Sequence, residues 1–283
     1  MGLEPKVKLG KKVTQTITDT TTLDLSHQDG SILCNNSSAK TITIPPNADV
    51  PFPVGTQVLV HTETAYPITI AAGAGVTINS AAYGNSSAVM AEIRATVVLE
   101  KTAVNTWLIS GEMAKPVEVF IPIDWAEDGA SPPEEAEVIA SGTGSIRGRN
   151  FESDSSEGVI INWRVPNNIY EAGLIKYKVH LAVTNETGPS GEGIVFSLSG
   201  FSLGSNDGLN GTYGTEVLSS ATSLTASQYD VVETDTSADV TITDLMRDEV
   251  TMMLLYRDHD HASDDYAQDV AVTGITLYYY TRY

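Results

Sequence analysis

The chain has 283 residues, of which 36 are Asp or Glu and 16 are Lys or Arg, so its formal net charge is −20 at pH 7. This charge argues against binding to nucleic acid or to anionic lipid, because both depend on a basic protein surface. Hydrophobic residues make up 41% of the chain, which is enough for one large domain or two medium ones.

The charge is unevenly distributed. Residues 1–115 contain 8 basic and 9 acidic side chains, whereas residues 116–283 contain 8 basic and 27 acidic ones. This asymmetry indicates two units with different surroundings. The acidic unit is suited to face solvent. The near-neutral unit begins with Lys6, Lys8, Lys11 and Lys12, which favour either contact with another surface or a solvated charged tail.

The sequence contains no signal for export or membrane insertion. The N-terminus is polar and basic, and no apolar run is long enough to cross a bilayer, so we expect synthesis in the cytoplasm. The one cysteine, Cys34, excludes an intramolecular disulfide framework. It lies in a strand-like run and is expected to be a buried small hydrophobe.

Apolar residues alternate with polar ones at period two along almost the whole chain, which predicts an all-β protein. In residues 92–100, Ile93, Ala95, Val97 and Leu99 share one face and polar side chains take the other. Proline and glycine clusters separate such runs. The expected strands of the first unit include residues 40–44, 56–62, 67–70, 92–100 and 105–111.

These patterns divide the chain into four parts. Residues 1–19 form an N-terminal arm, and residues 20–111 form a small β module, either a barrel or a sandwich. Residues 112–135 are acidic and contain four prolines, so they are predicted to be a linker with at most one strand, 117–121. Residues 136–283 form the second domain.

About eight strands are expected in the second domain. Eight antiparallel strands of uneven loop length in about 150 residues favour a two-sheet jelly roll. An immunoglobulin-like sandwich is the alternative, but the Cys-Trp-Cys spacing that would support it is missing. The strand candidates are residues 136–141, 158–164, 174–184, 192–199, 214–218, 239–243, 250–257 and 268–281.

One of these strands is apolar on both faces. Between residues 250 and 256 only Thr251 is polar, so the strand needs the core on one side and a loop or a neighbouring subunit on the other. We therefore predict an oligomer interface there. Its residues would be Val250, Met252, Met253, Leu254, Leu255 and Tyr256.

Four elements of the first unit together suggest a family. They are Thr41–Pro46, Phe52–Val60, Ile68–Asn79 and Asn105–Gly111. In their order and spacing they resemble a small β module of tailed-bacteriophage virion proteins, found in tail fibres, tailspike-like chains and head-attached fibres. The second unit looks like the outer jelly-roll domain of a phage surface protein.

The resemblance implies a place on the virion surface, contacts with capsid or tail proteins, and a homotrimer. It carries no catalytic motif and no cofactor, so none is expected here. Because the chain has no repeated shaft segment, a capsid decoration protein or head fibre is favoured over a tail fibre. A monomeric carbohydrate-binding module or adhesin and a tail-associated polysaccharide depolymerase are the remaining alternatives.

One cluster contains metal-ligand residue types. Imidazole and carboxylate side chains could hold Zn²⁺, and carboxylates alone could hold Ca²⁺. The spacing matches no known metal loop, so an acidic solvated hairpin is favoured. The candidate ligands are Asp258, His259, Asp260, His261, Asp264 and Asp265.

Two further features bear on glycan binding. The C-terminal tyrosines Tyr278, Tyr279, Tyr280 and Tyr283 are more simply explained by core or subunit packing than by sugar stacking. The loop 200–214 is expected to be exposed and held by a rigid scaffold, which makes it the predicted contact surface for host glycans. Its candidate residues are Asn206, Asp207, Asn210 and Tyr213.

Overall fold

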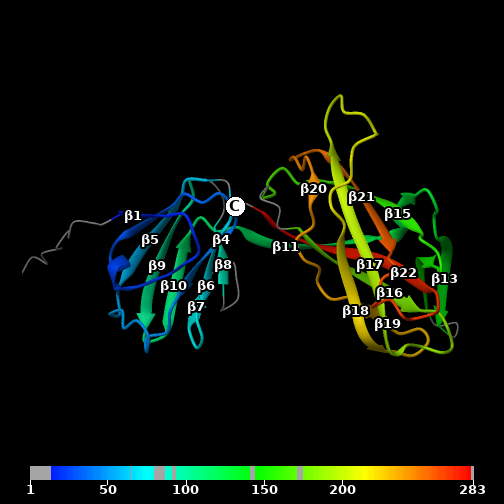
Figure 1. The fold of residues 1–283 in the computed structure, drawn as a ribbon, viewed down its shortest axis with the longest axis horizontal. Helices are drawn as coiled ribbons and strands as arrows, with labels where there is room; N and C mark the ends of the chain where they lie inside the picture. Colours follow the sequence, from blue (N-terminus) through cyan, green and yellow to red (C-terminus); the bar gives the residue numbers. More distant parts are fainter. Residues whose placement is uncertain are drawn as a thin grey trace, which may run out of the picture. The chain divides into compact units, whose positions relative to one another are not determined.

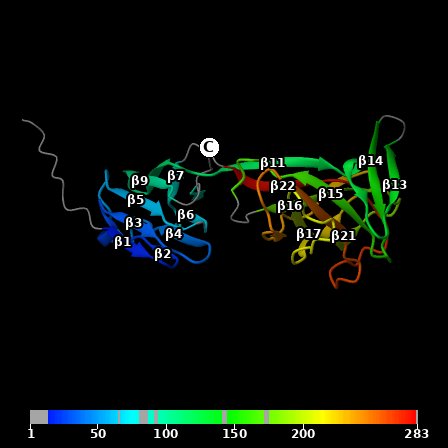
Figure 2. The same cartoon turned by 90° about the horizontal axis from the view of Figure 1, so that it is seen from above.

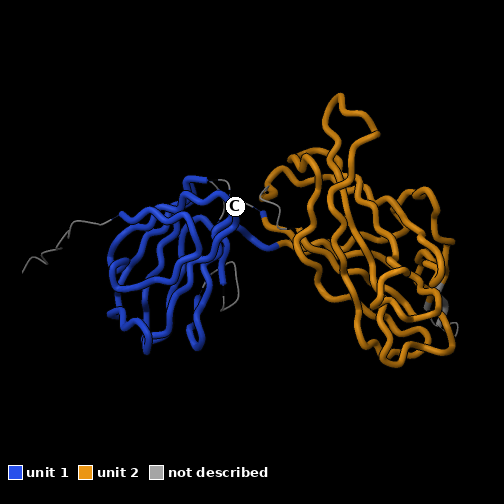
Figure 3. The backbone as a smooth tube through the Cα atoms, viewed as in Figure 1, with its two compact units in different colours: residues 1–116, 281–283 blue, residues 117–280 orange. Residues whose placement is uncertain are grey.

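The computed structural model describes residues 14–64, 66–79, 87–90, 94–140, 144–170 and 175–281. The first thirteen residues of the predicted arm, with their four lysines, lie outside this range. The chain divides into two compact units, residues 1–116 with 281–283 and residues 117–280 (Figure 3). Both units consist of β-sheets, so the all-β prediction is confirmed.

Unit 1 is a sandwich of two sheets whose first strands pair in parallel. The first six strands belong alternately to the two sheets. Strands β1, β3 and β5 pair in parallel in one sheet, and β2, β4 and β6 lie in the other, where β2 and β6 pair in parallel with β4. The strands are β1 (Thr14–Ile17), β2 (Thr21–Thr22), β3 (Ser31–Cys34), β4 (Lys40–Ile44), β5 (Gln57–Thr62) and β6 (Ile68–Ala72).

Four further strands complete both sheets of unit 1, three through antiparallel pairs and the fourth, at the edge of the larger sheet, through a parallel pair. The sheet orders are β1-β3-β5-β9-β10-β7 and β2-β4-β6-β8. The apolar faces of both sheets enclose a core in which the rings of Phe52 and Trp107 meet edge to face, 5.4 Å apart. The added strands are β7 (Thr77–Asn79), β8 (Ser87–Val89), β9 (Thr96–Ala103) and β10 (Thr106–Gly111), and a short 3-10 helix, η1 (Leu25–His27), precedes β3.

The core of unit 1 also encloses two groups with shifted pKa values. Burial raises the pKa of the Cys34 thiol to about 12, so this thiol is protonated and unreactive at neutral pH. Lys101 is 2% exposed and its Nζ donates to Asn47 Oδ1 and to the Phe52 carbonyl, at 2.5 and 2.7 Å. Burial lowers the pKa of Lys101, whereas these hydrogen bonds satisfy its ammonium group.

Unit 2 is a jelly roll of two packed sheets. The first, which we call the β22 sheet, has the order β13-β14-β22-β16-β19, with β11 also paired to β22. The second, the β21 sheet, has the order β12-β15-β21-β17-β18, with β20 also paired to β17. From β14 to β17 the chain alternates between the sheets. Near its end, β21 pairs with β15 and β22 pairs with β14, so late strands lie beside early ones, as in a jelly roll (Figures 1 and 2).

Register in unit 2 follows the alternation of the sequence. Tyr177, Val179 and Leu181 of β16 face the core, and so do Met253 and Leu255 of β21. The strands are β11 (Lys115–Pro122), β12 (Glu127–Asp128), β13 (Glu134–Ala140), β14 (Gly144–Phe151), β15 (Gly158–Arg164), β16 (Lys176–Val183), β17 (Ser190–Leu203), β18 (Val217–Thr225), β19 (Val231–Glu233), β20 (Ile242–Thr243), β21 (Val250–Arg257) and β22 (Val270–Thr281).

Residues 112–135 differ from the predicted linker. They contain β11, a second 3-10 helix η2 (Ile123–Trp125), β12 and the start of β13. Ile121 and Ile123 are buried in the core of unit 2. The linker was predicted from the prolines and carboxylates of this segment. Both are compatible with a strand here, because Pro116 and Pro122 lie near the ends of β11 and its acidic residue Glu118 is exposed.

Candidate functional site

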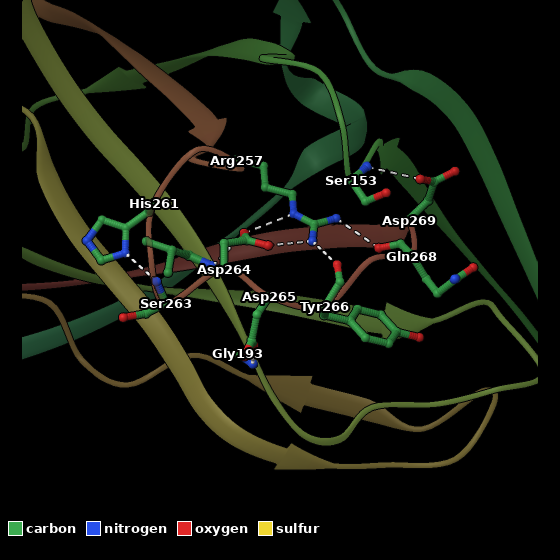
Figure 4. A network of polar contacts seen from close by, with 11 residues as sticks. Ser153, Gly193, Arg257, His261, Ser263, Asp264, Asp265, Tyr266, Gln268 and Asp269 are labelled. Carbon is green, nitrogen blue, oxygen red and sulfur yellow. Dashed lines mark hydrogen bonds and ion pairs between the residues drawn. The ribbon is translucent and has the colours of Figure 1, made fainter.

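The segment between β21 and β22, which contains the six predicted metal ligands, is organised by a buried arginine (Figure 4). Arg257 ends β21 on the core-facing side and is fully buried. Its Nε and Nη2 donate to Asp264 Oδ2 and Oδ1 at 3.0 and 2.6 Å, a bidentate ion pair. The remaining donors bind the carbonyls of Tyr266 and Gln268 at 2.7 and 2.9 Å.

The same segment is fastened to β17 by its own carboxylates. Asp264 Oδ2 accepts from the Val195 N–H at 2.9 Å, and Asp265 Oδ1 accepts from the Gly193 N–H at 2.6 Å. The Tyr266 hydroxyl donates to the Thr187 carbonyl at 3.0 Å. The two carboxylates therefore have protein partners, and we call this segment, residues 258–269, the Arg257 clamp.

The other predicted ligands do not converge. His261 Nδ1 accepts from the Ser263 N–H at 3.1 Å, and His259 Nε2 lies 3.3 Å from Asp260 Oδ1. Asp258 is also within the clamp, where its N–H binds the Val195 carbonyl. Within the described ranges, no group of three or more His, Cys, Asp or Glu side chains could hold a metal ion.

The predicted glycan loop connects β17 to β18 and projects beyond the ends of the strands (yellow in Figure 1). Beside it lies an open hollow of about 240 Å³. The predicted residues Asp207 and Asn210 line this hollow, whereas Asn206 and Tyr213 do not. The other lining residues are Phe201, Ser202, Leu203, Gly208, Gly211, Thr212, Thr243 and Asp244.

Two lining residues were missed by the sequence analysis. Thr243 ends β20 and Asp244 follows it, and β20 pairs in parallel with β17 at Gly200 and Phe201. This pairing places them beside a loop that is more than thirty residues earlier in the chain. The sequence predicts a strand over residues 239–243, but strand alternation does not show which strand it pairs with, so no sequence signal linked the two segments.

Aromatic packing shapes the hollow. Phe201 is 3% exposed and meets the ring of Tyr213 edge to face, 4.9 Å apart. Gly211 lies against the Phe201 ring so closely that an added Cβ would be 2.2 Å from it. A side chain at this position would push the loop away from the strand, so the glycine is what allows the hollow to form.

The predicted oligomer strand lies in the middle of the β21 sheet, and its six residues divide between two faces. Met253 and Leu255 point into the core, so their assignment to an interface is wrong. Val250 is 41% exposed, and Met252, Leu254 and Tyr256 are half-buried on the outward side. The Tyr256 hydroxyl donates to the Glu216 carboxylate, and burial, together with that carboxylate, raises the pKa of Tyr256 to about 12.

On the outward side of β17, β18 and β21, the register-paired residues from Val195 to Leu203 of β17 and their partners include no charged side chain. We call this side the neutral face. The Glu216 carboxylate contacts Tyr256 at the margin of this side, and Val195, Ser197, Ser199 and Phe201 are themselves buried. Charged residues lie at its margins, as Glu127 on β12 and Arg164 on β15. The register pairs that form the neutral face are Val195 with Ser220, Ser197 with Leu218 and Tyr256, Ser199 with Leu254, Phe201 with Met252, and Leu203 with Val250.

The outward side of the β22 sheet is different. Glu233 of β19 lies 3.4 Å from Lys178 Nζ and 3.3 Å from His180 Nδ1, both on β16. Lys176 Nζ lies 3.8 Å from an oxygen of Asp239. Charged side chains of both signs therefore cover this side, and it contrasts with the neutral face of the same unit.

No family model and no curated protein matches the chain. Among solved structures, the chain is similar to tripeptidyl peptidase 2, with 11% identity and a TM-score of 0.27 over 70% of this chain. It is also similar to the structure of infectious bursal disease virus Gx strain, with 10% identity and a TM-score of 0.25 over 69% of this chain. The chain spans 14% and 44% of these two proteins.

Among the residues that the structure describes, none forms a helix long and apolar enough to cross a membrane.

Proposed function

We propose that this protein is a non-enzymatic structural component of a bacteriophage virion surface, and that it assembles as a homotrimer through the neutral face. The observation that carries the proposal is the contrast between this face and the charge of the unit around it. Residues 116–283 have 27 acidic and 8 basic side chains, yet the paired residues of the neutral face on three adjacent strands include none of them.

Self-association of such a unit requires a surface of this kind. Copies that meet through acidic surfaces bring carboxylates together, and the repulsion opposes contact. Copies that meet through the neutral face bury apolar side chains, worth roughly 25 cal/mol per Å² of apolar area. In the single chain this area is still available on β21, where Val250 is exposed and Met252, Leu254 and Tyr256 are half-buried, and at the exposed Leu218 of β18. The β17 residues from Val195 to Phe201 on this side are already buried and add little to it.

The two units support a division of labour. Unit 1 contains the four elements that resemble the phage module, and residues 1–115 have a net charge of only −1, from 8 basic and 9 acidic side chains. We assign attachment to the capsid or tail to this unit. The acidic jelly roll would face solvent, where its charge keeps neighbouring particles apart.

The test is the native mass of the purified chain by light scattering and native mass spectrometry. We expect three times the mass of one chain, which is 30.2 kDa. Val250→Glu should return the protein to single chains, because it places a carboxylate on the neutral face. Val231→Glu is the matched control, since Val231 is 58% exposed on β19 of the other sheet and its variant should stay trimeric.

Each other result would count against the proposal. A mass of two chains would overturn the trimer, and a single chain at the highest usable concentration would overturn self-association. Dissociation by both variants would show that added charge, rather than the neutral face, controls assembly. Unfolding curves of both variants confirm that the fold is kept, because both positions are exposed.

A further inference from the structure

The hollow beside the β17–β18 loop shares Phe201 and Leu203 with the neutral face, but the assembly role does not use its polar side chains. We infer that it is a carbohydrate-binding site that takes the end of a neutral or amino sugar chain through Asp207, Asn210 and Asp244. The inference rests on the proposed function only for the source of the sugar, a host cell surface. The site itself is argued from the residues that line the hollow.

The first reason is that the polar side chains of the hollow have unused hydrogen-bonding capacity. Asp207 Oδ2 accepts from the Gly204 N–H at 2.8 Å, which leaves the other oxygen without a partner among the described residues. In the same part of the chain, the side chains of Asn210, Thr212, Thr243 and Asp244 make no hydrogen bond to one another or to the loop. Carboxylate, amide and hydroxyl groups gathered in one place match the hydroxyls of a sugar.

The second reason is that the scaffold under the hollow is rigid. The floor is β17, which pairs with β21 from Phe196 to Leu203, and the opposite wall is held by the pairing of β20 with Gly200 and Phe201. The loop itself is fastened where Gly214 N–H donates to the Gly200 carbonyl at 2.9 Å. Binding groups on a fixed scaffold lose less conformational entropy when a ligand arrives.

Size and charge limit the ligand. The volume of about 240 Å³ is below the roughly 300 to 1,000 Å³ of pockets that enclose a small molecule, so the hollow takes one end of a longer ligand. The lining contains two carboxylates and no cationic side chain. A uronic acid, sialic acid or phosphate would be repelled, which favours neutral and amino sugars.

The test is binding of the intact protein to an immobilised panel of neutral, N-acetylated, amino and uronic-acid oligosaccharides. Asp244 and Asn206 both have left-handed backbone conformations, with φ of 55° and 78°, which glycine adopts without strain. Asp244→Gly and Asn206→Gly are therefore a matched pair in which only the first residue lines the hollow. Asp244→Gly should weaken binding about tenfold or more, since it removes hydrogen bonds to a charged group.

We expect wild type and Asn206→Gly to bind neutral or amino members equally, and Asn210→Ala to lose binding as Asp244→Gly does. Absence of binding to every member, a preference for uronic acids, or equal weakening by Asn206→Gly would each overturn the inference. Binding that disappears when calcium is chelated would also overturn it, because the contact would then depend on a cation. The native mass of Asp244→Gly should equal that of wild type, which would show that its loss of sugar binding is not caused by a failure of assembly.

Discussion

Two polar loops of unit 2 use the same residue types in opposite ways. In the Arg257 clamp, Asp264 and Asp265 bind a guanidinium and backbone N–H groups. In the hollow, the carboxylate of Asp244 and the amide of Asn210 have no such partner among the described residues. The comparison teaches that a cluster of ligand-type residues indicates a binding site only when the fold has not already satisfied those residues.

The largest expected effect is in the Arg257 clamp. Arg257→Met leaves the Asp264 carboxylate buried without its partner, and we expect a loss of about 3 to 5 kcal/mol in the free energy of unfolding. Denaturant unfolding measures it. Arg164→Met is the control, because Arg164 is exposed and lies 3.9 Å from Asp248, so its removal should cost less than about 1 kcal/mol.

A double variant sharpens this prediction. Replacing both partners, as Arg257→Met with Asp264→Leu, removes the unpaired charge but also the bonds of Asp264 to β17. We expect it to be more stable than Arg257→Met alone, since an uncompensated buried charge costs more than its absence. If the single variant were as stable as wild type, the clamp would not be a structural element.

A smaller effect is expected at the hollow. Gly211→Ala brings a Cβ against the Phe201 ring, and the loop must shift at a cost of about 1 to 3 kcal/mol. The change in thermal unfolding temperature measures this cost. Leu209→Ala in the same loop should have almost no effect, because Leu209 is 81% exposed. Equal destabilisation by both variants would contradict the packing of Gly211 on Phe201.

The smallest effect depends on pH and lies beside the clamp. Burial, followed by the charges of Glu152, Asp269 and Glu134, raises the pKa of Glu157, and a hydrogen bond from the Glu152 N–H opposes this. A raised carboxyl pKa contributes stability below the ordinary value of 4.5 that is lost as pH rises through the raised value.

We therefore expect Glu157→Gln to be more stable than wild type at neutral pH, with the difference vanishing below pH 4.5, since glutamine keeps the acceptor but not the charge. Thermal unfolding at a series of pH values measures the difference. A difference that is constant with pH would show that Glu157 is not the titrating group.

The alternation of the sequence predicted much of the fold, and its failures have identifiable causes. Strands with one wet face, such as β16, were found because period two follows burial. The parallel pairing in unit 1 could not be found, since Ser31 pairs with Thr14, 17 residues earlier, and with Leu59, 28 residues later. Such unequal spacing leaves no repeat for a sequence to show.

The site residues were partly predictable for a related reason. Arg257 continues the core-facing positions Thr251, Met253 and Leu255 of β21. Because both faces of this strand are apolar in the sequence, alternation did not show that the arginine is buried, and the ion pair with Asp264 was therefore not predicted. Asp244 was not predicted either, because its position depends on the pairing of β20 with β17, which alternation within one strand does not show.

The parallel start of unit 1 has a consequence for how such a protein can change in length. Within the described chain, β1 pairs with β3 and β2 pairs with β4, each on one side. A further pair of strands, one added beside β1 and one beside β2, would widen each sheet by about 4.8 Å, the spacing of neighbouring strands. Because β7 and β8 are the opposite edge strands of the two sheets, such growth would leave the pairing at those edges unchanged. The architecture therefore allows unit 1 to change in size by duplication of short segments without any change in the fold of unit 2.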